Sequence, residues 1–189
     1  MEKRIRIAWG ITGAGDRLKE TVEVMKELKK SYDAEIRVYA SHAGEQVLKW
    51  YRILDVVKNS FGRFYVERDA NSPFLAGEIQ IGKFAALVIA PATANTVAKI
   101  AGGIADTLLS NSALMALKAF VPVYIMPSDY KEGEVITELP DGKKLRLRVR
   151  REDVEHVEML RKTDGVFIVE SPDELEEELK KLLSQKLDT

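Results

Sequence analysis

Small residues fill the loops that follow strand-like runs in this sequence. The loop GITGAG follows the first run, SHAG follows the second, and APATAN ends the apolar run AALVIA. In parallel α/β folds, ligands bind beyond the carboxyl ends of the strands, where small residues let backbone N–H groups approach an anion at a helix start. The residues expected to act in this way are Gly10, Gly13 and Gly15, which turn the backbone, and Thr12, which adds a hydroxyl donor.

The glycine loop departs from the dinucleotide pattern G-x-G-x-x-G. A dinucleotide site also places an acid at the end of the second strand, where it binds the ribose hydroxyls. That position holds Ser41, with His42 beside it. Because a hydroxyl donates to phosphate and a carboxylate repels it, the two loops favour a terminal monophosphate. The alternative is a glycine-rich connection that binds nothing, since short glycine motifs often match by chance.

The loop after the apolar run offers little side-chain bulk and several backbone donors and acceptors. It consists of Pro91, Ala92, Thr93, Ala94 and Asn95. Such a loop suits the edge of a flat heteroaromatic ring. Asn95 can cap the following helix, or it can offer both a donor and an acceptor to the ring. A phosphate at one strand end and a flat ring at another together predict flavin mononucleotide (FMN).

Strand patterns alternate with helix patterns along the rest of the chain. The strands are expected at 4–9, 34–41, 85–90, 121–126 and 165–169, and the helices at 17–30, 44–57, 95–118, 151–161 and from 171. Asp16 and Ser171 are expected N-caps. The alternation predicts one α/β domain over residues 1–189, doubly wound, with three Rossmann-like layers and a mostly parallel sheet.

Other segments depart from this alternation. Residues 59–83 mix aromatic residues with Gly and Pro and predict an irregular excursion. Residues 134–150 predict a β-hairpin with its turn at Pro-Asp-Gly. Gly102 and Gly103 interrupt the helix pattern at 95–118, which indicates either the close approach of another backbone, such as a neighbouring subunit, or a local break.

Composition excludes several kinds of site. The 29 basic and 30 acidic residues nearly cancel, so no overall charge favours nucleic acid or an anionic membrane. The chain has no cysteine, which excludes disulfides, thiolate nucleophiles and cysteine-held zinc or iron–sulfur clusters, and its two histidines argue against a histidine-rich metal site. With no signal segment and no apolar run of ~20 residues, a cytoplasmic protein is expected.

The strings GITGAG, Ser41 and APATANTVAKIAGGIADTLLS resemble the flavoprotein family of homo-oligomeric flavin-containing decarboxylases and their relatives. The resemblance covers roughly residues 5–127, and it implies FMN, a flavodoxin-like sheet and a homo-oligomer built on trimers. It implies a structural or interfacial role for Asp106. It would place Gly10, Thr12, Gly13, Ala14 and Gly15 around the phosphate with Ser41, and Pro91 to Asn95 along the isoalloxazine ring.

Departures from the family bear on the chemistry. Its decarboxylases carry a catalytic histidine at the position of Gly77, a Pro-x-Met-Asn segment and a cysteine near the C-terminal flap. This chain instead has MPSDY at 126–130 and no cysteine. It also lacks the arginine with which the prenyltransferases hold a substrate phosphate. It looks most like the archaeoflavoprotein and dihydromethanopterin reductase branch.

The expected function is therefore electron transfer through FMN. The donor would be ferredoxin or an iron–sulfur flavoprotein, and the acceptor a partner protein or a pterin near Ser128 and Asp129. The alternatives are a flavin-dependent decarboxylase of the phosphopantothenoylcysteine decarboxylase type and a nucleotide-binding module without chemistry. A stripe in the hairpin is expected to be a solvated face or a docking surface for an acidic partner; it comprises Lys144, Arg146, Arg148 and Arg150.

Overall fold

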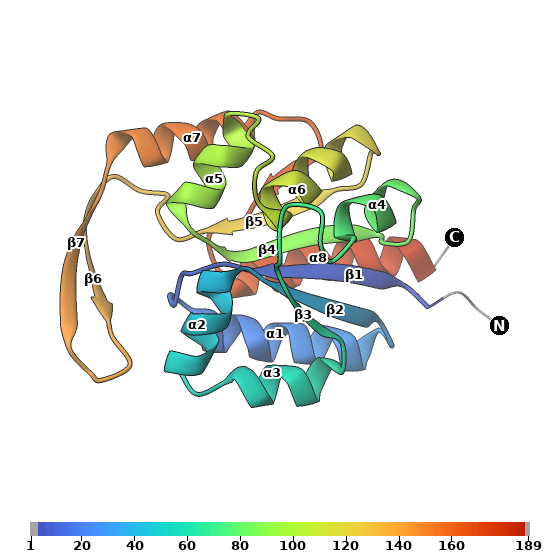
Figure 1. The fold of residues 1–189 in the computed structure, drawn as a ribbon, viewed down its shortest axis with the longest axis horizontal. Coiled ribbons are helices and arrows are strands. Elements are labelled where there is room, and N and C mark those ends of the chain that lie inside the picture. The colour runs from blue at the N-terminus through green and yellow to red at the C-terminus, as the bar shows by residue number, and fades with distance from the viewer. Residues whose placement is uncertain (1–3, 188–189) are drawn as a thin grey trace.

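Six parallel strands form the central sheet of the computed structural model, which describes residues 4–187 (Figure 1). Their order across the sheet is β3-β2-β1-β4-β5-β8. The strands are β1 (Arg6–Ile11), β2 (Glu35–Ala40), β3 (Phe64–Val66), β4 (Ala86–Ala92), β5 (Val123–Pro127) and β8 (Val166–Ile168). The order reverses direction between β1 and β4, where the loops of a doubly wound sheet diverge and leave room for a ligand.

Helices cover both faces of the sheet (Figure 1). One face packs against α1 (Leu18–Ser31), α2 (His42–Trp50), α3 (Leu54–Phe61) and α8 (Pro172–Leu187). The other packs against α4 (Leu75–Gln80), α5 (Ala94–Ala101), α6 (Leu108–Lys118) and α7 (Arg151–Arg161). Along β4, Val88 joins the first core and its neighbours Leu87 and Ile89 join the second. Burial on both faces explains why the whole of this strand is apolar.

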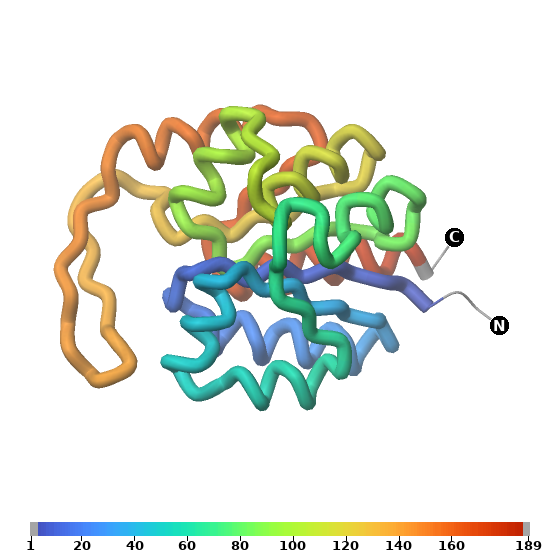
Figure 2. The backbone as a smooth tube through the Cα atoms, in the orientation of Figure 1, coloured from blue at the N-terminus to red at the C-terminus, as the bar shows by residue number. Residues whose placement is uncertain are grey.

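A two-stranded antiparallel hairpin stands beyond the carboxyl ends of the sheet strands (Figures 1 and 2). It consists of β6 (Gly133–Glu138) and β7 (Lys144–Val149). Val135 lies opposite Leu147 on one face, and Glu134 lies opposite Arg148 on the other. The predicted fold, a doubly wound α/β sheet with this hairpin insertion, is confirmed.

Two helix starts test the predicted N-caps. Ser171 caps α8, because its hydroxyl accepts a hydrogen bond from the N–H of Glu174 at 3.1 Å. The prediction for Asp16 is wrong: α1 begins one residue later, after Arg17, whose φ is 54° and whose side chain makes no capping bond. The Asp16 carboxylate instead accepts a hydrogen bond from the hairpin.

Two predicted long helices are each divided in the structure. The segment 44–57 contains parts of α2 and α3, which are separated by a turn in which Arg52 has a φ of 58°. The segment 95–118 divides into α5 and α6. Gly102 ends α5, Gly103 has a φ of 70°, and Thr107 caps α6 through a reciprocal bond with Ser110. A local break therefore accounts for the paired glycines. The excursion at 59–83 contains β3 and α4.

Candidate functional site

The β1–α1 and β4–α5 loops are joined through one buried hydroxyl. Thr12 Oγ1 donates to the carbonyl oxygen of Pro91 at 2.7 Å and accepts from the N–H of Thr93 at 3.0 Å. The side chain of Thr12 is almost fully buried. Its single proton is thus used within the chain, and donation from Thr12 to a ligand stays a prediction. The hydroxyl instead fixes the predicted ring loop against the glycine loop.

The β2–α2 loop lies against the glycine loop on its other side. The Ser41 N–H donates to the Ile11 carbonyl at 3.0 Å, and a Cβ added to Gly13 would lie 2.8 Å from the Cβ of Ala43. Ser41 caps α2, with its Oγ accepting from the Gly44 N–H at 3.0 Å. Because that bond uses only the oxygen, the Ser41 hydroxyl proton stays free to donate to a ligand.

The glycines of the first loop have different roles. Gly10 lies inside β1, where a Cβ would meet the Leu109 side chain at 2.7 Å, so its small size serves the packing of α6 on the sheet. Gly13 and Gly15 lie beyond the strand and are partly exposed. A Cβ on Gly15 would meet the Tyr51 ring at 2.5 to 2.7 Å. The expected phosphate loop is therefore centred on residues 12–15, with Ala14 buried between these two glycines.

The ring loop holds a side-chain amide that makes no hydrogen bond within residues 4–187. Thr93, and not Asn95, caps α5, with its Oγ1 accepting from the N–H of Thr96. Asn95 is exposed in the first turn of α5. Of the two expected roles of Asn95, the N-cap is therefore not observed, and a contact of its amide with a ring edge stays a prediction. Ala94 beside it is partly exposed, whereas Pro91 and Ala92 form the buried end of β4.

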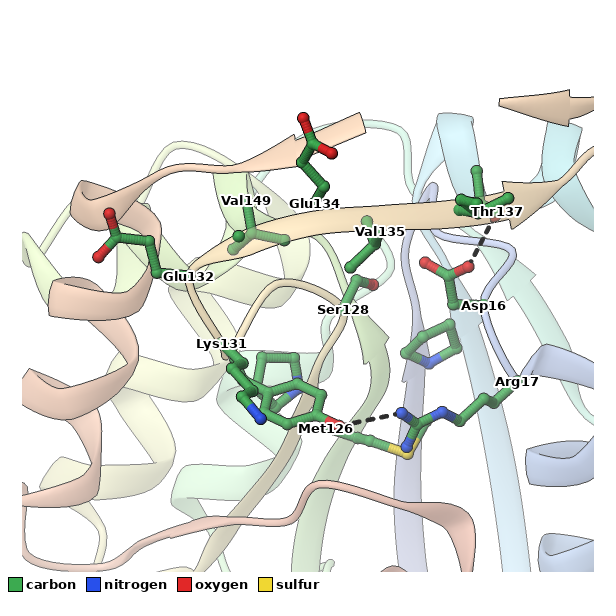
Figure 3. Close-up of a pocket in the computed structure, with 15 residues that line it drawn as sticks. Asp16, Arg17, Met126, Ser128, Lys131, Glu132, Glu134, Val135, Thr137 and Val149 are labelled. Atoms are coloured by element: carbon green, nitrogen blue, oxygen red, sulfur yellow. Dashed lines mark hydrogen bonds between the residues drawn. The ribbon is translucent and has the colours of Figure 1, made fainter. Parts of the chain in front are cut away.

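A pocket of about 510 Å³ opens beside this loop, between the strand ends and the hairpin (Figure 3). Pro91 and Met126 belong to its sheet side, and Val135 and Thr137 belong to its hairpin side. Ser128 lines it, and the Ser128 hydroxyl has no hydrogen-bond partner among the described residues. The volume is within the range of small-molecule sites.

Asp129 is not among the residues that line this pocket, unlike its neighbour Ser128. Burial raises the pKa of the Asp129 carboxyl, and the nearby carboxylates of Asp153 and Asp16 raise it further. The pKa of Asp153 is lowered, chiefly by a hydrogen bond from Arg150. Asp129 therefore contributes negative charge at the margin of the site, not a wall of the cavity.

The hairpin is tied to the glycine loop and to the turn after α2. Thr137 Oγ1 donates to Asp16 Oδ1 at 2.9 Å, and the Tyr51 hydroxyl donates to the Glu138 carbonyl at 3.2 Å. Sequence reasoning identified the hairpin but not its contribution to the pocket. The available signal was the pair Val135 and Ile136 between Glu134 and Thr137, because apolar residues on a hairpin need something to cover them.

The predicted basic stripe is partly neutralised. Arg146 forms a bidentate pair with Glu134, and Arg150 pairs with Asp153. Lys144 and Arg148 are exposed and have no ion pair within the described chain.

Asp106 forms an ion pair with Lys99 at 2.8 Å, which bridges α5 and the start of α6.

At the position that corresponds to the decarboxylase histidine, a side chain would require the exposed ring of Phe74 to move. A Cβ on Gly77 would lie 2.0 Å from the ring of Phe74. Across residues 4–187, no group of three metal-ligating acids, histidines or cysteines occurs. The helices of that region are also too short or too polar to cross a membrane.

Comparison with known proteins identifies similar chains. The model of the family described as Flavoprotein matches residues 1–179. The uncharacterized protein MJ0730 of Methanocaldococcus jannaschii is 49% identical over 96% of this chain and 98% of its own length. A dihydromethanopterin reductase (acceptor) of the same organism is 42% identical over 76% of this chain, but the match spans only 62% of that reductase.

A solved structure resembles the whole chain. DmrB of Burkholderia xenovorans in complex with FMN, described as a cubic protein cage for redox transfer, is 33% identical over 100% of both chains, with a TM-score of 0.84.

Proposed function

Since the chain belongs to the Flavoprotein family, we propose that it binds FMN and uses it to reduce a dihydropterin. The similarity to a dihydromethanopterin reductase and to an FMN-bound structure supports both parts of the proposal. The observation that carries it is the Thr12 hydroxyl, which holds the glycine loop and the ring loop side by side.

The residues fit a flavin mononucleotide. Gly13, Ala14 and Gly15 would hold the phosphate together with the free proton of the Ser41 hydroxyl. The first turn of α2 adds backbone N–H groups beside the phosphate. The isoalloxazine ring would lie along the loop that Pro91 begins, with the unpaired amide of Asn95 at its edge.

When bound, FMN supplies reversible transfer of one or two electrons. The protein's part is to position the ring, to exclude water and to leave a cavity for the second substrate. The hairpin excludes water, because Val135 and Val149 bring apolar groups over the pocket. Reduction of one C=N bond of a dihydropterin takes up two electrons and two protons.

The electrons would come from a separate protein such as ferredoxin or an iron–sulfur flavoprotein. Without cysteine the chain has no thiolates with which to hold a cluster of its own. Lys144 and Arg148, both exposed and unpaired in the described chain, would favour an acidic donor at the hairpin.

Because the similar DmrB is described as a cage, we propose that this chain also forms a homo-oligomer, built on trimers.

Titration of the purified protein with FMN tests the cofactor, with flavin fluorescence as the readout. We expect saturable quenching at one FMN per chain. Anaerobic reduction by ferredoxin and by NAD(P)H, measured separately as the loss of flavin absorbance, then tests the donor. The loss of dihydropterin absorbance tests the acceptor. A colourless protein that binds no added FMN would instead support a nucleotide-binding module without chemistry.

A further inference from the structure

The side of the pocket nearest the sheet carries positive charge that no acid neutralises within residues 4–187. Arg17 and Lys131 both line this cavity, and neither forms an ion pair there. The proposed FMN contacts use neither residue.

Arg17 is held in place by neutral groups. Its guanidinium donates to the backbone carbonyl of Glu170 and, at 3.1 Å, to the Tyr130 hydroxyl. The guanidinium carbon also lies 5.8 Å from the centre of the Tyr130 ring. These contacts fix the orientation of the group and leave its charge uncompensated. A guanidinium has five N–H donors, so several remain for a ligand.

The acids that line the same pocket are engaged or directed elsewhere. Asp16 accepts from Thr137, and Glu134 is paired with Arg146. Figure 3 shows Glu132 and Glu134 on the hairpin side, pointing outward, whereas Lys131 extends toward the level of Met126 and Arg17. The lining therefore holds two cations without an ion pair among the described residues, Arg17 and Lys131, and two acids without one, Asp16 and Glu132.

We propose that Arg17 and Lys131 bind an anionic group, carboxylate or phosphate, on the tail of the second substrate. The inference rests on the proposed function and assigns Arg17 and Lys131 to the recognition of its second substrate. Charge-assisted hydrogen bonds to a guanidinium and an ammonium would orient the tail and so align the heterocycle with the ring loop. The other source of such an anion is the FMN phosphate, because Arg17 follows Gly15 closely in the sequence.

Equilibrium binding distinguishes these sources. The FMN-loaded full chain is titrated by calorimetry with folate, whose tail carries carboxylates, and with 6-hydroxymethylpterin, whose tail is neutral. Wild-type protein should bind folate at least tenfold more tightly. Lys131→Gln should remove most of that preference, since a hydrogen bond to a charged group accounts for about a tenfold change in affinity. Lys162→Gln is the matched control: this lysine is also exposed and has no ion pair among the described residues, but it does not line the pocket.

Arg17→Lys is the second variant, and its preference for folate should fall. Because lysine cannot reproduce the guanidinium bond to the Glu170 carbonyl, the folding of this variant is checked by circular dichroism. Equal affinity for the two pterins in wild-type protein would overturn the inference. A Lys131→Gln variant that loses FMN affinity and keeps the preference would assign the anion site to the cofactor. If wild-type protein binds no FMN, the proposed function fails, and the same two titrations on the chain alone still decide the anion site.

Discussion

The hydroxyl of Thr137 lies 2.9 Å from the carboxylate of Asp16 and joins the hairpin to a loop 121 residues earlier in the chain. Asp16 directly follows the glycine loop, and Thr137 lies near the tip end of β6. This one bond, together with the contact between Tyr51 and Glu138, holds the hairpin across the mouth of the pocket.

Replacing Thr137 by Val should loosen the hairpin without unfolding the protein. The substitution keeps the β-branched shape and removes one exposed hydrogen bond of about 1 kcal/mol. We expect bound FMN to dissociate about fivefold faster, with little change in melting temperature. Stopped-flow flavin fluorescence measures the rate. Thr163→Val, which removes a hydroxyl bond to the Met159 carbonyl after α7, is the control and should leave the rate unchanged.

The sheet and the position of the ligand loops could be predicted from the sequence because both depend on local patterns. AALVIA is apolar at every position, which is typical of a strand buried on both faces, and β4 is such a strand. Small residues at neighbouring strand ends converge because parallel strands share one carboxyl edge. Thr12 joins two of these loops, as that geometry requires.

What could not be predicted depends on contacts between distant residues. Nothing near Asp16 indicates that its partner is Thr137 instead of a helix N–H. The division of 95–118 did have a local signal, since Gly103 takes a positive φ and Thr107 begins a capping motif. The apolar spacing continues across this break and conceals it. Arg17 and Lys131 are distant in the sequence and line one pocket only in the folded chain.

The Gly13 site predicts a coupled pair of substitutions. Gly13→Ala would place a Cβ 2.8 Å from that of Ala43, an overlap that should cost about 1–3 kcal/mol of unfolding free energy. Ala43→Gly alone should cost about 1 kcal/mol because glycine disfavours a helix. If the overlap is the cause, the double variant will be clearly more stable than the sum of the two losses predicts. Urea unfolding of all four proteins measures the coupling, and strict additivity would contradict this origin.

Asp129 predicts a change in stability with pH. Its folded-state pKa is raised by burial and by Asp153 and Asp16, so its ionised form destabilises the folded chain. Asp129→Asn should therefore raise the melting temperature at neutral pH. The gain should shrink as the pH falls through the raised folded pKa. It should vanish below the ordinary value of 3.8, where Asp129 is protonated in both the folded and the unfolded chain. A gain that persists below pH 3.8 would show that charge is not its source.

Ser41 gives the sharpest test of the phosphate site. Aspartate is as good an N-cap as serine, so Ser41→Asp should keep α2 folded while it places a negative charge beside the proposed phosphate. Two charges about 4 Å apart near a protein surface repel by about 4 kcal/mol, and FMN affinity should fall at least a hundredfold. Ser171→Asp makes the same change at the N-cap of α8, outside the loops proposed to hold FMN, and should weaken FMN binding far less. Fluorescence titration compares the two variants, and unchanged affinity in Ser41→Asp would mean that the phosphate binds elsewhere.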